Sequence, residues 1–171
     1  MNLNTFKNLY ISELQDLYSA ETQLLTAIPR LIVAASNMDL KRALEEHLNQ
    51  TYEHVNRLDQ IFAELMVQKN TELCDAMKGI LTEGEKIIRK FGDDDVKDAA
   101  LIASAQRVEH YEIAAYGSTR TFAKHLGYDQ HVKLLQKTLD EEGNADKTLT
   151  KIAEGNWFSQ GLNQEALSKT S

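Results

Sequence analysis

Four segments of this sequence place a carboxylate or an imidazole on a helical face that is otherwise apolar. Glu21, for example, lies seven residues after Leu14 and three before Leu24, which is the spacing of a single helical face. A carboxylate-rich set with some imidazole is typical of iron or manganese sites. The candidate metal ligands are Glu21, Gln50, His54, Glu109, Glu112, Glu142 and Asp146.

The candidates also share a depth along their segments. Depth along a helix follows from position in the sequence, because an α-helix rises about 1.5 Å per residue. One candidate lies near the middle of each long helix: Glu21, His54, Glu109 and Glu142. Helices that pack side by side would bring these residues into one central layer. Independent surface charges would have no reason to share that depth.

Such a layer would hold several carboxylates away from water. Its acids would be Glu21, Glu109, Glu112, Glu142 and Asp146. Without partners these groups would repel one another and keep raised pKa values, because burial of an unpaired charge is costly. Two divalent cations would offset about four of the five negative charges. The sequence therefore predicts a pair of iron or manganese ions per chain as the cofactor.

Each candidate also has an ordinary structural interpretation. A buried glutamate is commonly ion-paired with an arginine, and the available partners are Arg57, Arg107 and Arg120. His47 shares a face with His54 and is expected to be a hydrogen-bonded core residue, while Glu141 is expected to be solvated. The histidines expected at the surface or on the flank of a helix are His110, His125 and His131. The coincidence on four helices is what favours the metal site.

Apolar periodicity near 3.6 residues predicts the helices that must position this layer. The expected helical ranges are about 4–36, 39–67, 71–91, 95–126 and 129–154. Asn37 and the aspartates at 93–95 are expected to cap the helices that follow them, and Gly127 is expected just after a helix end. With one proline and eight glycines in 171 residues, the chain has too few turn residues for an all-β domain.

Connection lengths then predict the topology. Short loops join the first helix to the second and the fourth to the fifth, so each pair is expected to be antiparallel. The roughly 28 residues between the second and fourth helices are enough to return along the bundle. The expected fold is all-α, a ferritin-like four-helix bundle with a long central crossover that contains a short fifth helix. Residues 1–155 would form this bundle, and residues 156–171 a C-terminal tail that is either docked or frayed.

Charge and composition exclude several classes of protein. The formal net charge is −7 without any block of Lys and Arg, so neither nucleic acid nor an anionic membrane surface is an expected partner. No apolar run approaches the roughly 20 residues of a membrane span, and residues 1–7 lack the pattern of a secretion signal. The single cysteine, Cys74, excludes an internal disulfide and a thiolate metal cluster. A cytoplasmic protein is the expectation.

The same polar residues carry a family resemblance over about residues 5–153. The matching segments are DLYSAETQL at 16–24, VEHYEIAAYG at 108–117, and residues 47–51, 99–103 and 139–142. These segments resemble the YciF/YciE-type bacterial stress proteins, which have a ferritin-like fold, and 108–117 is the most specific of them. The resemblance implies a cytoplasmic, homodimeric four-helix bundle related to rubrerythrin and ferritin. It does not assign a reaction.

The chain departs from the pattern of these proteins in two ways. Ferritins and rubrerythrins carry Glu-x-x-His on two helices, and no histidine here has a glutamate three residues before it. In the family that the chain resembles, Glu is expected at the position of Gln50 and Gln at the position of His54. This exchange would either move a ligand one turn along the same face or mark a weakened site.

The sequence supports two main hypotheses of function. In the first, a dinuclear iron or manganese site acts on peroxide or dioxygen, and any other small-molecule substrate is unknown. In the second, the chain is a non-enzymatic homodimer, a stress or interaction protein whose polar layer is structural and metal-free. Iron storage in a ferritin-like cage ranks third, because a shell needs extensive subunit contacts that the sequence does not show.

Overall fold

The five expected helices are present in the computed structural model, which describes residues 3–69, 72–156 and 159–168. They are α1 (Phe6–Ala34), α2 (Met38–Leu65), α3 (Asp75–Ile88), α4 (Asp94–His125) and α5 (Asp129–Glu154). A short arm follows, made of the strands β1 (Gly155–Asn156) and β2 (Ser159–Gln160) and the helix α6 (Leu162–Leu167). Within the described ranges, no helix combines the length and apolarity needed to cross a membrane.

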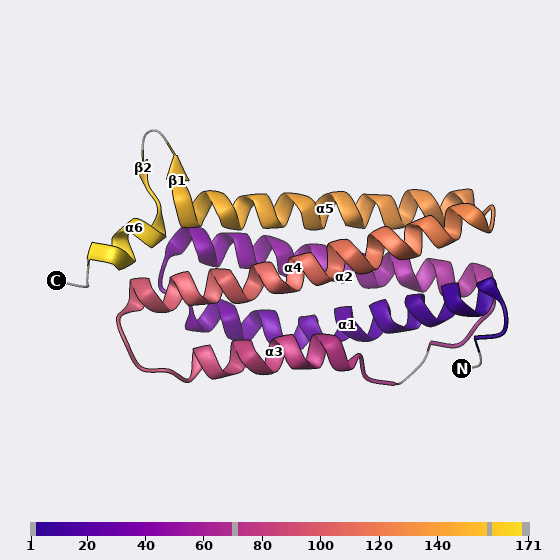
Figure 1. The fold of residues 1–171 in the computed structure, drawn as a ribbon, viewed down its shortest axis with the longest axis horizontal. Coiled ribbons are helices and arrows are strands. Elements are labelled where there is room, and N and C mark those ends of the chain that lie inside the picture. Colours follow the sequence, from indigo (N-terminus) through magenta and orange to yellow (C-terminus); the bar gives the residue numbers. More distant parts are fainter. Residues whose placement is uncertain (1–2, 70–71, 157–158, 169–171) are drawn as a thin grey trace.

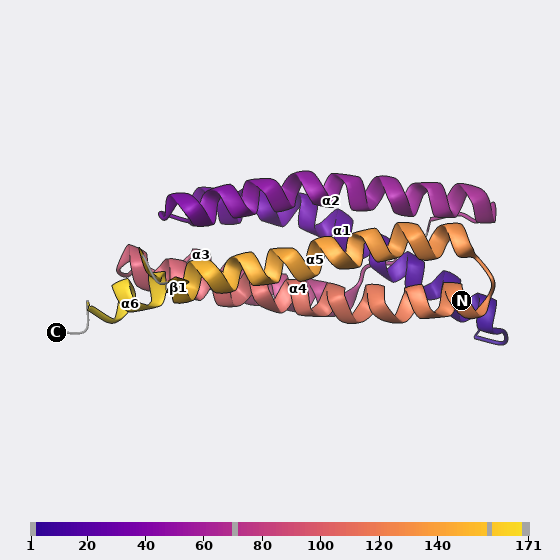
Figure 2. The ribbon, with the colours of Figure 1, turned by 90° about the horizontal axis from the view of Figure 1, so that it is seen from above.

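The four long helices α1, α2, α4 and α5 form an elongated bundle (Figures 1 and 2). α1 and α2 are antiparallel neighbours, and so are α4 and α5. α2 also packs against α5 and α1 against α4, which closes the bundle, while α3 lies in the crossover against α1 and α4. The expected ferritin-like four-helix bundle with a central crossover is therefore confirmed.

Capping groups set where the helices begin and end. Thr5 Oγ1 accepts the backbone N–H of Asn8 at 3.1 Å at the start of α1, and the side chains of Asn37 and Asp93 cap α2 and α4 in the same way. Gly127 follows α4 with φ +74°, a left-handed conformation that favours glycine. These helix ends lie within one or two residues of the predicted ones.

α3 is shorter than the predicted range 71–91. The backbone N–H of Cys74 donates to Ser19 Oγ on α1 at 2.8 Å, and the carbonyl of Cys74 accepts from Gln23 Nε2 at 3.2 Å. These contacts hold Cys74 in an extended conformation, so the helix starts only at Asp75. A tie to a distant helix, which local periodicity does not report, therefore decides this boundary.

Two apolar clusters fill the bundle. The first includes Leu24, Ile28, Leu40, Leu44, Leu101 and Leu149. The second includes Tyr10, Leu14, Leu17, Leu58, Ile61, Tyr116 and Leu135. Each cluster takes side chains from all four long helices, so together they fix which face of every helix points inward.

The C-terminal arm is docked on the bundle. Leu162 is buried in the first apolar cluster, and α6 packs on α4 and α5. Gly161 lies against the last turn of α5, where a Cβ would come within 2.4 Å of the carbonyl oxygen of Ala153. A larger residue there would push the arm away. Trp157 and Phe158, which belong to the predicted tail, lie outside the described residues.

Asp98 ties the turn between α1 and α2 to α4. The side chain is buried, and its carboxylate accepts the backbone N–H groups of Ser36 at 3.0 Å and Asn37 at 2.5 Å. Both N–H groups belong to the turn that makes α1 and α2 antiparallel. One carboxylate of α4 therefore holds the two helices of the other pair at a fixed level.

Asp98→Ala is expected to lower the free energy of unfolding by about 2–4 kcal/mol, because the turn loses a charged acceptor for its N–H groups. Urea denaturation measures the change. The control Asp94→Ala, in the exposed first turn of the same helix, is expected to cost less than about 1 kcal/mol. A loss for Asp98→Ala no larger than that of the control would contradict the role given to this tie.

Candidate metal centre

A layer of six polar side chains separates the two apolar clusters. They are Glu21 from α1, His47 and His54 from α2, Glu109 and Glu112 from α4, and Glu142 from α5. Each side chain is buried, with no residue more than 6% exposed. Along each helix they fall between residues of the first cluster and residues of the second. The packing that buries the clusters therefore also buries this layer.

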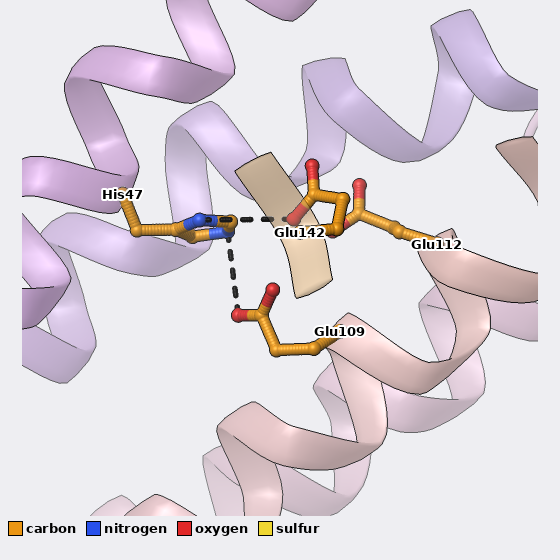
Figure 3. A group of neighbouring side chains, drawn as sticks. All are labelled: His47, Glu109, Glu112 and Glu142. Atoms are coloured by element: carbon orange, nitrogen blue, oxygen red, sulfur yellow. Dashed lines mark ion pairs between the residues drawn. The ribbon is translucent and has the colours of Figure 1, made fainter. Parts of the chain in front are cut away.

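His47 and three glutamates form a first group of possible ligands (Figure 3). One atom from each of His47, Glu109, Glu112 and Glu142 lies within 4.8 Å of the others. His47 Nε2 is 3.5 Å from Glu109 Oε1, and its Nδ1 is 3.9 Å from Glu142 Oε2. These distances exceed those of good hydrogen bonds, so the imidazole is surrounded by carboxylates without being bonded to them.

Glu21, His54 and Glu142 form a second group, whose ligand atoms again lie within 4.8 Å of one another. His54 Nδ1 is 2.9 Å from Glu142 Oε1 and 3.2 Å from Glu21 Oε1. Tyr116 donates a hydrogen bond of 2.6 Å to Glu21 Oε1 and so holds that carboxylate in place. Glu142 belongs to both groups, which makes the layer continuous across the bundle.

Many ligand-capable atoms of this layer have no hydrogen-bond partner among the described residues. The unpartnered atoms are Glu21 Oε2, both ring nitrogens of His47, His54 Nδ1, Glu109 Oε2, and both carboxylate oxygens of Glu112 and Glu142. His54 Nδ1 is in close ionic contact with Glu142 and Glu21, but these contacts do not have the geometry of a hydrogen bond. Buried polar atoms are nearly always paired in proteins, and an unpaired one costs about 1–3 kcal/mol. Their concentration at one level of the bundle indicates a site for water or a cation.

Crowding in the layer changes the affinity of its carboxylates for protons. Burial and then the charge of Glu142 raise the pKa of Glu109 well above its usual value. Burial, followed by the charges of Glu142 and Glu21, does the same to the pKa of Glu112. Burial alone would raise the pKa of Glu142 as well, but His54 and His47 beside it lower it. Without a cation, Glu109 and Glu112 therefore keep protons at pH values where exposed glutamates are ionised.

Arg57 and Glu141 hold His54 from outside the layer. Arg57 donates to Glu141 at 2.5 and 3.0 Å, and Glu141 Oε2 lies 3.1 Å from His54 Nε2. Burial alone would lower the pKa of His54, but the charge of Glu21 and the contacts with Glu141 and Glu142 raise it to about 11. Burial alone would raise the pKa of Glu141, but His54 and Arg57 lower it to about 2. The prediction that Glu141 is a solvated charge is therefore wrong.

Gln50 and Asp146, the other two predicted ligands, lie beside the layer. Asp146 is partly exposed, accepts a hydrogen bond from Gln106 Nε2 at 3.0 Å, and belongs to neither group of ligand atoms. The expected layer of five carboxylates therefore contains four. Gln50 is partly buried and lines a small pocket together with His47 and Glu109.

His47 is the candidate that sequence reasoning missed. Its expected role as a hydrogen-bonded core histidine is wrong, because neither ring nitrogen has a hydrogen-bond partner in the part of the chain that the structure describes. A signal was available, since His47 lies two helical turns before His54 on the same face. His131, expected at the surface or on the flank of a helix, is buried as well, with contacts of 3.0 Å to Tyr10 and to Glu64. His131 lies beside Tyr10 of the second apolar cluster, outside the polar layer.

Comparison with known proteins identifies the family. Residues 5–166 match the family described as a domain of unknown function, DUF892, and the chain belongs to that family. Protein YciF of Escherichia coli strain K12 is 43% identical to it over 157 residues, which cover 91% of this chain and 95% of YciF. The expected resemblance to YciF-type proteins is therefore confirmed.

Solved structures share the same fold. The crystal structure of the E. coli stress protein YciF matches with a TM-score of 0.85 and 42% identity, covering 87% of this chain and 94% of that chain. YcfI from Rhodopseudomonas palustris matches with a TM-score of 0.86 and 38% identity, covering 89% and 97%. A protein from Xanthomonas campestris pv. campestris, 17% identical with a TM-score of 0.71, shares the fold alone.

The raised pKa values imply that the metal-free protein loses stability as the pH rises. The stability contributed by Glu109 and Glu112 is lost as the pH rises above 4.5, their ordinary pKa. The stability contributed by His54 is fully present below pH 6.5, and it is lost as the pH rises from 6.5 to about 11. For each group that is protonated in the folded chain but not in the unfolded chain, the free energy of unfolding falls by about 1.4 kcal/mol per pH unit. Urea denaturation of chelator-treated protein between pH 6.5 and 9 measures this decline.

His54→Gln is expected to reduce the decline, because the substitution removes a group whose pKa is raised from 6.5 to about 11 and which therefore holds its proton across this pH window. His110→Gln, at an exposed position of α4, is the matched control and is expected to leave the slope unchanged. Stability of the metal-free protein that rises with pH over this window would contradict the electrostatic description of the layer.

Proposed function

We propose that this chain holds two iron or manganese ions in its polar layer and acts on peroxide or dioxygen. The proposal rests on the concentration of buried, unpaired carboxylate oxygens and imidazole nitrogens at one level of the bundle. A ligand set of carboxylate oxygens together with a few imidazole nitrogens suits iron and manganese. The donor atoms on these four helices therefore fit a pair of iron or manganese ions.

The two groups of side chains divide the ligands between the ions. His47, Glu109 and Glu112 would hold one ion, Glu21 and His54 the other, and Glu142 would be available to both. Cations in the layer would replace the protons that Glu109 and Glu112 otherwise retain. Iron or manganese bound there would supply the redox chemistry that proteins use on peroxide and dioxygen.

Residues around the layer would position the ligands and keep bulk water out. Glu141, itself held by Arg57, contacts His54 Nε2 and so leaves Nδ1 directed at Glu21 and Glu142. Tyr116 fixes one oxygen of Glu21 and leaves the other unpaired. The apolar clusters on either side shield the layer from bulk water, so electrostatic interactions within it are strong.

A second candidate function is a metal-free structural layer in a homodimeric stress or interaction protein. It is favoured by His54, which lies within ion-pair distance of Glu21, Glu141 and Glu142 and would neutralise part of the layer when protonated. In the other half of the layer His47 lies farther from its carboxylates, 3.5 Å from Glu109 and 3.9 Å from Glu142, distances too long for good hydrogen bonds. In the described residues Arg57 pairs with Glu141, and the carboxylates of the layer have no arginine or lysine ion pair.

Metal titration separates the two proposals. Metal-free protein titrated anaerobically with Fe²⁺ or Mn²⁺ is expected to bind two ions per chain by elemental analysis, and the loaded protein to consume hydrogen peroxide. His54→Ala is expected to lower the affinity by about tenfold or more, and affinity should fall as the pH drops because a metal-bound imidazole must be neutral. His110→Ala, exposed on α4, serves as the control. If the wild-type protein bound no metal, the dinuclear site would be contradicted and the metal-free structural layer would remain as the function of these residues.

Gln50→Glu tests the exchange of residues on α2. The new carboxylate would lie in the pocket beside His47 and Glu109, so without metal it is expected to destabilise the protein by about 1–3 kcal/mol. With iron or manganese it is expected to raise the affinity, and the melting temperature should recover. Gln60→Glu, exposed on the same helix, is the matched control. Destabilisation that neither metal rescues would contradict the dinuclear site.

A further inference from the structure

A small pocket between α2 and α5 reaches the polar layer. Its volume is about 50 Å³, which is room for a few water molecules. Its walls include Ala43, Glu46 and Gln50 from α2 and Ala145 and Thr148 from α5. The pocket is also lined by His47 and Glu109, two buried members of the first group of ligand atoms. It therefore connects the candidate site with the gap between these helices.

The pocket continues outward into a wider groove. Ala43, Glu46 and Thr148 line both the pocket and a groove of about 500 Å³ that α2, α5 and the C-terminal arm form together. Glu46 and Thr148 are exposed, so this shared edge is the mouth of the pocket. The charged residues of the groove are Asp39, Glu46 and Glu165 against Arg42 and Lys151. Together with the net charge of −7, this balance favours cations over anions near the mouth.

His47 gives the pocket its chemistry. It is 6% exposed, and within the described ranges both of its ring nitrogens lack hydrogen-bond partners. Glu109 lies beside it with Oε2 also unpaired. A cation in the pocket would therefore meet an imidazole nitrogen and a carboxylate oxygen that can replace water in its coordination shell.

We propose that this pocket is the access route by which a divalent cation reaches the layer, an inference that rests on the proposed metal-binding function. Glu46 attracts the cation to the mouth, and His47 and Glu109 receive it at the inner end. A pocket of this size admits the cation only after loss of most of its water, so oxygen atoms of Glu46 and Gln50 replace water along the wall. The small side chains of Ala43 and Ala145 keep the route open.

Ala43→Leu narrows the mouth without removing a ligand. Metal-free protein is mixed with Co²⁺, an oxidation-resistant probe, and the ligand-field absorption is followed by stopped flow. Uptake is expected to slow about tenfold and release to a chelator by the same factor, while the equilibrium affinity stays within about threefold, because the substitution changes the barrier and not the end states. Ala63→Leu, exposed on the same helix, is the control and should change neither rate.

Glu46→Gln keeps the size of the side chain and, at an exposed position, leaves folding intact. Uptake of Co²⁺ is expected to slow about threefold at low ionic strength, and the difference should disappear at high salt because screening removes the attraction. Glu45→Gln, also exposed and outside the pocket, is the matched control.

The outcomes distinguish the access route from the site it serves. Wild-type protein that takes up no Co²⁺, Fe²⁺ or Mn²⁺ would overturn the proposed function and the access route with it. Uptake by the wild type at a rate that neither Ala43→Leu nor Glu46→Gln changes would overturn the access route alone. A weaker affinity in Ala43→Leu with an unchanged uptake rate would do the same, because it would place the effect of the substitution at the site.

Discussion

Four carboxylates buried in one layer are the constraint on which the rest of this structure depends. Glu21, Glu109, Glu112 and Glu142 lie within a few ångströms of one another or of the same histidines, where ionised groups cannot stay together without compensation. The chain supplies part of that compensation through His54 and through protons on Glu109 and Glu112. The remainder of the cost is offset by the apolar clusters above and below, which is why each long helix extends well beyond the layer in both directions.

The fold was largely predictable because it depends on repeated local signals. Apolar residues recur at helical spacing along each long helix, and caps such as Asn37 and Gly127 mark where the helices begin and end. The start of α3 and the docking of the C-terminal arm were not predictable in this way. Cys74 is held by Ser19, and Gly161 by the backbone of α5, and both are contacts between segments that are distant or irregular in sequence. Local periodicity carries no information about such contacts.

The candidate site was predictable to the level of helical faces and no further. Five of the seven predicted side chains meet in the layer. For these five, the apolar periodicity indicated the correct helical face, and the position along the helix indicated the correct depth. Asp146 lies one turn after Glu142 on the same face of α5, yet Gln106 of α4 draws it aside. Glu141 is adjacent to Glu142 and was expected to face solvent, but Arg57 of α2 binds it against His54. Which residue of a face becomes part of the layer is thus decided by partners on neighbouring helices, and these are absent from any single-helix pattern.

Glu142 makes the two halves of the layer thermodynamically dependent on each other. Among the described side chains it alone belongs to both the His47 group and the His54 group, and one carboxylate has one charge and one orientation at a time. Whatever fixes that carboxylate in one half alters what the other half can bind. In the proposed dinuclear site such coupling would be reciprocal, so the factor by which occupation of the His47 half changes affinity at the His54 half would also operate in the opposite direction. In that site a single side chain of α5 would make two adjacent groups of ligand atoms one cooperative unit.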